Sequence, residues 1–229
     1  MRLCLLSSVV FLTTILFVGC ANRQMMNTES GFLLKYDDLE YSKGIHNAKF
    51  YVSRDTDFFK YEYLYIKPIQ ILHNIKKENL TKDQKKLFKE IQNYLTKRYK
   101  YIIQGNNNYT LVNDINHKNT LIFEASISAV EIHSDDMRGM DFMPMMLVMK
   151  SISNSIKDST VRVLCETRLS DVNTAKVLMK TLRLHKGTKV NVSEDKLTFK
   201  DVKPALDDWL DGTKNNLYKL KNSVIKNKK

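Results

Sequence analysis

The stretch TKDQKKLFKEIQNYLTKRY, residues 81–99, decides how the rest of the chain must fold. Thr81, followed three residues later by Gln84, fits a capping box, in which each side chain satisfies a backbone N–H at the start of a helix. The apolar side chains then recur at helical spacing, opposite a lysine-rich face: Leu87, Phe88, Ile91, Leu95 and Tyr99. A helix with one apolar stripe must bury that stripe against another layer, and we expect the layer to be a sheet.

The strongest strand pattern follows this helix, in NTLIFEASISAVEI at residues 119–132. Apolar and polar side chains alternate there with the period of two that belongs to a strand with one buried face. The alternation predicts that Glu124, Ser126 and Ser128 face away from the apolar core. It predicts that the apolar set faces the core: Leu121, Phe123, Ala125, Ile127 and Ala129.

Four further segments are rich in aromatic and β-branched residues and are predicted as strands: 48–54, 61–72, 161–169 and 176–185. Turn residues at 170–174 join the last two. Pro68 cannot donate to a sheet, so its end of the second strand must be an edge, a bulge or an exit. Residues 101–112, YIIQGNNNYTLV, carry turn residues at 105–108 and are predicted as a hairpin.

A second helix is predicted near the C-terminus, beginning near Asp201 with Pro204 tolerated in its first turn. Gly212 weakens the middle of this helix by about 1 kcal/mol relative to alanine. One face carries the residues expected in the core: Val202, Leu206, Trp209, Thr213, Leu217 and Leu220. Together the segments predict a single α/β layered domain over residues 31–222. Its sheet is mixed or antiparallel, with two or three amphipathic helices packed mainly on one face.

The N-terminus has the three parts of an export signal, which does not belong to the folded domain. Arg2 is the only charge in residues 1–19, an apolar run follows, and the run ends in FVGC at 17–20. This ending resembles the lipobox of bacterial lipoproteins, which implies lipid on Cys20 and cleavage before it. Residues 1–19 are then a signal peptide and 20–30 a lipidated tether. Ala21, where an aspartate would retain the protein at the inner membrane, implies a periplasm-facing position on the outer membrane.

The chain is basic, with 37 Lys and Arg against 25 Asp and Glu and a net charge of +12. A basic surface favours anionic partners, and outside the cytoplasm these are anionic lipids or acidic envelope polymers rather than nucleic acid. The densest cluster of lysines is at residues 214–229 and ends in a basic tail at 223–229. We interpret it as a solvated helix end whose lysines suit the helix dipole, in preference to a lipid-binding tail.

Of the three cysteines, Cys4 leaves with the signal and Cys20 carries lipid, so Cys165 stands alone. No intramolecular disulfide can then form in the mature chain. Cys165 alternates with Val161 and Val163, and we expect a buried, unreactive thiol.

Five segments in order resemble a family of bacterial lipoproteins known only as domain of unknown function 3313. They are SGFLLKYDDL at 30–39, YEYLYIKPIQI at 61–71, LTKDQKKLFKEIQNYL at 80–95, VRVLCETRLSDVNTAKVL at 161–178 and FKDVKPALDDWLDG at 199–212. The resemblance spans about residues 30–220. It implies a fold and a compartment but no mechanism.

Residues that could carry chemistry are few and scattered. The five histidines show no metal-ligand spacing, and HSDDM at 133–137 is more typical of a solvated turn than of a cation site. No phosphate-binding loop, nucleophile elbow or dinucleotide fingerprint is present. We therefore predict no catalytic residues, no metal and no cofactor, although a site assembled in space from Ser, His and a carboxylate remains open.

Six methionines between 137 and 149 form the most distinctive stretch of the folded part. They suit three interpretations: core packing by a helix at about 144–157, a groove for a partner or an acyl chain, or a Cu(I) site. The candidate ligand or partner residues are Met140, Met143, Met145, Met146 and Met149.

The sequence thus favours a non-catalytic outer-membrane lipoprotein that acts as an envelope interaction or scaffold module with a protein partner. The first alternative is a periplasmic carrier of lipid or a small ligand that uses the Met-rich segment. A closed pocket of roughly a few hundred Å³ lined by those methionines would favour the carrier, and an exposed apolar patch on a filled core would favour the scaffold. The second alternative is a hydrolase.

Overall fold

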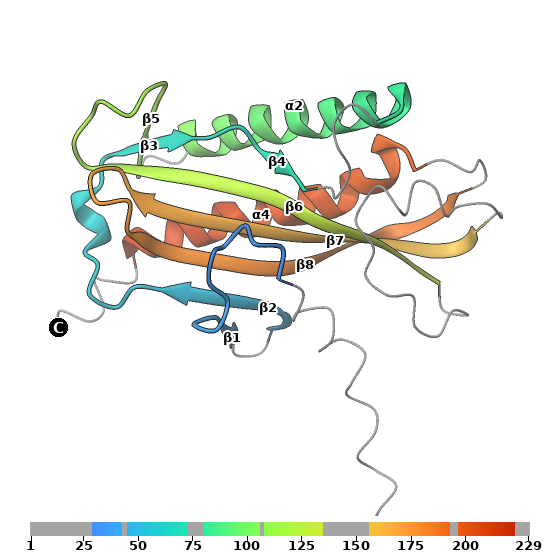
Figure 1. The fold of residues 1–229 in the computed structure, drawn as a ribbon, viewed down its shortest axis with the longest axis horizontal. Coiled ribbons are helices and arrows are strands. Elements are labelled where there is room, and N and C mark those ends of the chain that lie inside the picture. Colours follow the sequence, from blue (N-terminus) through green and yellow to red (C-terminus); the bar gives the residue numbers. More distant parts are fainter. Residues whose placement is uncertain are drawn as a thin grey trace, which may run out of the picture.

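The computed structural model describes residues 29–42, 45–72, 80–105, 108–134, 156–192 and 197–222. Within these ranges the strands form one mixed sheet in the order β1-β2-β8-β7-β6-β3-β5, with β4 also paired to β6 (Figure 1). The strands are β1 (Glu40–Ser42), β2 (Ile45–Val52), β3 (Tyr63–Ile66), β4 (Gln70–Ile71), β5 (Thr110–Val112), β6 (Thr120–Ser134), β7 (Ile156–Asp171) and β8 (Val177–Val192). The helices are α2 (Lys82–Gln104) and α4 (Phe199–Asn222), besides a short 3-10 helix at Phe58–Lys60. The predicted class, an α/β layered domain, is confirmed.

The long strands are antiparallel neighbours, whereas β3 and β4 run parallel to β6 and β3 runs parallel to β5. A parallel connection needs a crossover, and α2 supplies it between β4 and β5. The predicted strand 61–72 is divided in two, because Pro68 lies between β3 and β4 and cannot join the ladder.

Helix α2 begins as predicted, with both hydrogen bonds of the Thr81–Gln84 capping box present. The predicted hairpin at 101–112 is wrong. Residues 101–104 are the last turn of α2, and only Thr110–Val112 is a strand. Ile102 and Ile103 continue the buried stripe of the helix, so burial against the core overrides their preference for strands.

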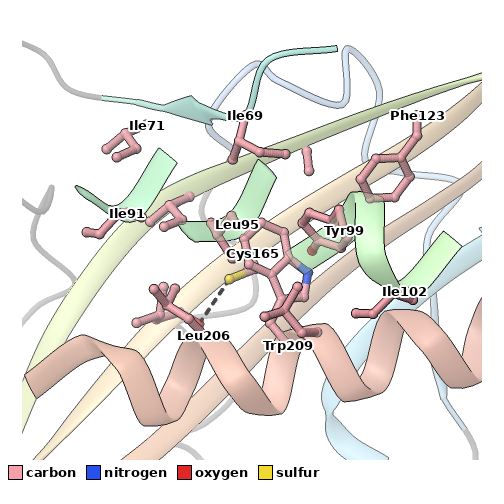
Figure 2. Packing of buried hydrophobic residues seen from close by; sticks show 14 of the residues in the cluster. Ile69, Ile71, Ile91, Leu95, Tyr99, Ile102, Phe123, Cys165, Leu206 and Trp209 are labelled. Atoms are coloured by element: carbon pink, nitrogen blue, oxygen red, sulfur yellow. Dashed lines mark hydrogen bonds between the residues drawn. The ribbon is translucent and has the colours of Figure 1, made fainter. Parts of the chain in front are cut away.

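Both helices pack on one face of the sheet, where the larger apolar core lies. Figure 2 shows Leu206 and Trp209 of α4 pointing toward Leu95 and Tyr99 of α2. The Trp209 and Tyr99 rings meet edge-on with centroids 5.7 Å apart. Every residue predicted on the inner face of α4 is buried.

Strand β6 alternates as predicted only as far as Ile127. Its register against β7 shifts between Ile127 and Ala129, where Ser128 is one extra residue, and such a bulge inverts the faces of the residues that follow. Ala129 therefore packs with Leu164 in the second cluster, on the face away from the helices, and the prediction that it shares a face with Ile127 is wrong. Val130 takes the helix-facing position instead.

The Met-rich segment 137–149 lies outside the described residues, as do Met140, Met143, Met145, Met146 and Met149. The helix proposed for about 144–157 is wrong at its C-terminal end, since β7 begins at Ile156. The signal segment, Cys20 and the basic tail also lie outside the described residues.

The face of the sheet away from the helices carries paired charges. The Arg168 guanidinium donates to both oxygens of Glu124, with Nε–Oε2 at 2.7 Å and Nη2–Oε1 at 3.0 Å, and the Lys67 ammonium donates to Oε1 at 2.9 Å. Burial alone would raise the pKa of Glu124, but these hydrogen bonds outweigh it and lower the pKa. Arg168 also donates to the carbonyl of Phe32 at 2.8 Å.

Further hydrogen bonds tie residues 30–39 to this face, in front of the strands in Figure 1 while α4 lies behind them. The Tyr36 hydroxyl donates to Glu166 at 2.7 Å, and the Lys180 ammonium donates to the carbonyl of Lys35 at 2.8 Å and to Asp38. Because these donors and acceptors are directional, they place the segment on the sheet more specifically than its apolar contacts could.

We expect Arg168→Ala to lower the free energy of unfolding by about 3 kcal/mol, because it removes the two hydrogen bonds of the guanidinium to the buried Glu124 carboxylate, which keeps its bond to Lys67, and the bond to the Phe32 carbonyl. Urea unfolding followed by circular dichroism measures the change. Arg54→Ala is the matched control at an exposed arginine and should stay within about 0.5 kcal/mol of the parent. Equal losses in the two variants would show that the pair does not stabilise the fold.

Candidate functional site

A cavity of about 330 Å³ lies between β2, β8 and the C-terminal half of α4. It exists because α4 packs over β7 and β8, while β2 is the next strand outward. Two side chains of β2 that line the cavity, Phe50 and Val52, consequently stay 39% and 37% exposed. A helix placed beside the sheet edge rather than across it leaves this opening.

Most of the cavity wall is apolar. Val52 pairs in register with Met179 and Phe50 with Thr181, so β2 and β8 together form the floor. The apolar lining residues are Ala48, Phe50, Val52, Met179, Trp209, Leu217 and Leu220. Small-molecule sites usually combine such a wall with a few polar groups that orient the ligand.

Two polar side chains of the lining, His185 and Arg183, approach Asp208 of α4. Nδ1 of His185 lies 2.6 Å from Asp208 Oδ2, and Arg183 Nη2 lies 3.7 Å from the same oxygen. His185 is 1% exposed, yet its Nε2 has no hydrogen-bond partner among the described residues, and neither has the buried Nε of Arg183. Both residues line the cavity.

The protonation states of His185 and Asp208 follow from the contacts of the two side chains. Burial lowers the pKa of His185, and the opposing effect of the Asp208 carboxylate does not cancel it. The hydrogen bond from His185 lowers the pKa of Asp208 despite partial burial. An ionised carboxylate only accepts, so Nδ1 carries the proton and Nε2 of the neutral ring is an acceptor.

Gly212 explains how α4 comes this close to the strand beneath it. A Cβ at this position would lie 2.9 Å from Nη1 of Arg183 and 3.9 Å from Cε1 of His185. The helix-weakening glycine therefore leaves room for the two polar side chains under the helix. The sequence pattern predicted only its cost to the helix.

The Thr167 and Thr181 hydroxyls, which also face the cavity, are hydrogen-bonded to each other. Lys49 and Lys219 add positive charge to its lining. Among the buried side-chain atoms of the described lining residues, Nε of Arg183 and Nε2 of His185 are without a hydrogen-bond partner, and the exposed Asn216 adds a further polar side chain to the lining.

None of the residues predicted as functional contributes to this cavity. Cys20 and the five methionines lie outside the described residues. Cys165 is buried, as predicted, in the helix-side core, and burial is the main cause that raises the pKa of its thiol well above the ordinary value (Figure 2). His185 was one of five scattered histidines, and its partner Asp208 is 23 positions away, so no local spacing could have paired them.

Within the described ranges, no group of three or more His, Cys, Asp or Glu side chains could hold a metal ion. The cluster at His133, Asp135 and Asp136 lies outside the described side chains. No described serine or cysteine is hydrogen-bonded to Nε2 of His185. The described helices include none with the length and hydropathy needed to span a membrane.

A family model described as "Protein of unknown function (DUF3313)" matches residues 28–213 of the chain. This protein belongs to the DUF3313 family. The resemblance stated from five sequence segments is thereby confirmed, and it covers the whole cavity except its last few lining residues in α4. A comparison with curated proteins finds no match.

Solved structures similar to this DUF3313 protein are distant. A hypothetical protein from Chlamydia trachomatis shares 8% identity at a TM-score of 0.38, covering 69% of this chain and 98% of its own. A homologue of the neuraminyllactose-binding hemagglutinin from Helicobacter pylori shares 11% at 0.36, covering 79% and 90%. The PelC dodecamer from Paraburkholderia phytofirmans shares 10% at 0.34, covering 69% and 96%. Matches at this level carry no functional argument.

His185 should make stability depend on pH below neutrality. Because its folded pKa lies below the ordinary 6.5, the unfolded chain binds the proton more readily, and stability is complete above about pH 6.5 and lost as the pH falls through the folded pKa. We expect the free energy of unfolding by urea to fall between about pH 7 and about pH 5. The fall should be smaller in His185→Leu.

Asp208, with a pKa lowered from 3.8, contributes stability that is lost only at more acid pH, so the two effects separate. His117→Leu is the control, since His117 is exposed, and it should retain the slope of the parent protein. An unchanged slope in His185→Leu would contradict the assignment to His185.

Proposed function

We propose that this DUF3313 protein is a non-catalytic binding protein of the bacterial envelope that carries a small, largely apolar ligand in the cavity beside α4. The cavity is the single observation that supports this proposal. Its volume of about 330 Å³ falls in the range of small-ligand sites, and apolar side chains dominate its wall.

The cavity favours the carrier over the scaffold module, with one change from the sequence-based hypothesis. The described walls come from β2, β8 and α4 rather than from the Met-rich segment. A scaffold would be favoured by one exposed apolar patch, whereas the most exposed apolar side chains lie on separate elements: Leu34, Tyr101, Ile115 and Tyr218. The envelope protein partner stays a prediction.

A hydrolase needs a nucleophile beside the histidine. The described residues supply the His185–Asp208 pair without a hydroxyl or thiol bonded to Nε2. We therefore propose binding rather than catalysis.

The proposal includes the location of the protein. Lipid on Cys20 would hold it to the outer membrane, with the folded domain facing the periplasm. The outward face of α2 supports an anionic surface as a further contact. Its exposed residues include seven cations, Lys82, Lys85, Lys86, Lys89, Lys97, Arg98 and Lys100. Basic residues near an anionic lipid surface each contribute about 1 kcal/mol.

We expect Ala48→Trp to weaken the binding of N-phenylnaphthylamine, a neutral apolar fluorescent probe, by about tenfold or more, because the indole fills the space in which the probe would bind. Fluorescence titration of purified protein measures the affinity. Lys86→Trp, on the outward face of α2, adds the same indole away from the cavity and should bind the probe as the parent does. If Ala48→Trp binds the probe unchanged, the cavity is not the site.

We expect Cys20→Ser to move the protein from the outer-membrane fraction into the soluble periplasmic fraction, because stable anchoring needs the acyl chains that the thiol carries. Density-gradient fractionation and immunoblotting locate it. Cys165→Ala should stay with the outer membrane, since Cys165 is buried in the core. A Cys20→Ser protein that stays with the outer membrane after a high-salt wash would overturn the anchor.

A further inference from the structure

We infer that the outward face of α2 is the surface by which this protein lies against an anionic lipid bilayer. Of the proposed function, this inference rests only on the location in the envelope, and it does not depend on the cavity. Three features of α2 point to it: a row of lysines, the cost of that row to the helix, and a polar hollow beside it.

The lysines of α2 form a row along its outward side. Together with Asn93 they recur every three or four positions: Lys82, Lys86, Lys89, Lys97 and Lys100. Residues at this spacing share one face of a helix, and all of them are exposed. In Figure 1, α2 lies along the top of the molecule, and no described element covers its outer side. The row is about 27 Å long, at a rise of about 1.5 Å per residue, and forms a straight, convex ridge of positive charge.

This charge is a property of α2 rather than of the chain as a whole. The helix carries seven basic residues against two acidic ones, Asp83 and Glu90, a surplus of five positive charges. Helix α4 is one residue longer and carries five basic residues against four acidic ones. A lysine-rich composition alone would charge both helices alike, so it does not account for the difference.

The row works against the stability of the helix that carries it. Like charges three or four residues apart destabilise a helix, and so do cations in its first turn, where the dipole favours anions. Lys82 and Lys85 lie in the first turn, whereas the last turn, where the dipole would favour cations, has no basic residue. A surface of opposite charge would offset both effects, so the pattern indicates a partner rather than a solvated face.

An open hollow of about 450 Å³ borders the row, where α2 passes Pro68 and Ile69. Its described lining includes the ammonium groups of Lys97 and Lys100, the amide of Asn93 and no acidic residue. Ammonium and amide groups donate hydrogen bonds, and the oxygens of a phosphate accept them. The hollow can therefore take the phosphate of a lipid head group beside the ridge.

A bilayer suits this ridge better than a flexible acidic polymer does. A plane of lipid phosphates meets the whole length of a straight ridge at once, whereas a polymer loses conformational freedom to follow it. Attachment to the same membrane would also keep the ridge at a high local concentration near the lipids. Each basic residue near an anionic lipid surface strengthens binding by about fivefold.

Cosedimentation of purified Cys20→Ser protein with vesicles tests the contact, because the serine carries no acyl chain. We expect vesicles of phosphatidylglycerol and phosphatidylcholine in equal parts to bind at least about a hundredfold more tightly than vesicles of phosphatidylcholine alone. The difference should largely disappear at about 1 M salt, where the Debye length is about 3 Å. Equal binding to the two kinds of vesicle would contradict the docking surface.

A variant without the charges of the row assigns the contact to α2: Lys82→Gln, Lys86→Gln, Lys89→Gln, Lys97→Gln and Lys100→Gln together. It should lose at least about a hundredfold in affinity for the anionic vesicles and keep the circular dichroism spectrum of the parent.

The matched control removes five exposed lysines of other segments: Lys118→Gln, Lys176→Gln, Lys186→Gln, Lys200→Gln and Lys214→Gln together. It should stay within about threefold of the parent, since charges more than a Debye length from the lipids are screened. Equal losses in the two variants would show that net charge, and not α2, is responsible.

A tryptophan in the middle of the row reports the orientation of the bound protein. Fluorescence of Asn93→Trp should be quenched by brominated lipids in the anionic vesicles, because the indole would lie at the membrane interface. Asn215→Trp places the same indole at an exposed position of α4 and should not be quenched. Equal quenching of the two would overturn the orientation. This comparison needs no lysine variant, so misfolding of the fivefold variant would not protect the inference.

The outcomes separate membrane docking from the carrier function. If soluble polyglutamate binds as tightly per charge as the anionic vesicles do, the ridge binds an acidic polymer and the inference is wrong. If the vesicles bind as expected but N-phenylnaphthylamine does not, the carrier function is wrong and the docking surface stands. If the probe binds and the vesicles do not, the reverse holds.

Discussion

The burial of α4 against β7, β8 and α2 is the constraint on which the other features of this protein depend. Leu206 and Trp209 fill the space between the sheet and α2, and Trp209 meets the Tyr99 ring edge-on. The apolar stripe of α4 fits only there, so the helix lies over β7 and β8 and leaves part of β2 uncovered. The cavity and the contact of Asp208 with His185 both follow from this position of the helix.

The two faces of the sheet are held by different physics. Non-directional apolar packing joins the helices to one face, whereas hydrogen-bonded charges such as Arg168–Glu124 and Lys180–Asp38 hold residues 30–39 on the other. Residues 30–39 therefore lie on the face opposite the cavity.

Local patterns predicted most of the fold and almost none of the candidate site. The capping box of α2, the paired strands β7 and β8, and the buried face of α4 were predicted because each depends on neighbouring residues. The prediction of a hairpin at 101–112 was wrong because Ile102 and Ile103 extend the buried stripe of α2. The predicted orientation of Ala129 was wrong because the extra residue at Ser128 becomes evident only once β6 is aligned with β7. Periodicity within one segment contains no information about register between two.

The sequence by itself determined the layered fold class, the unpaired Cys165, the basic surface and the lipobox-like FVGC, since composition and short-range spacing suffice for these. It also contained His185, Arg183 and Asp208, but as separate residues without a shared motif. Only the tertiary structure brought them together, because Asp208 reaches β8 through the docking of α4 and Gly212 leaves the room for that approach. The cavity likewise belongs to no single segment: it is the space between a helix and a sheet edge, and packing alone decides its position.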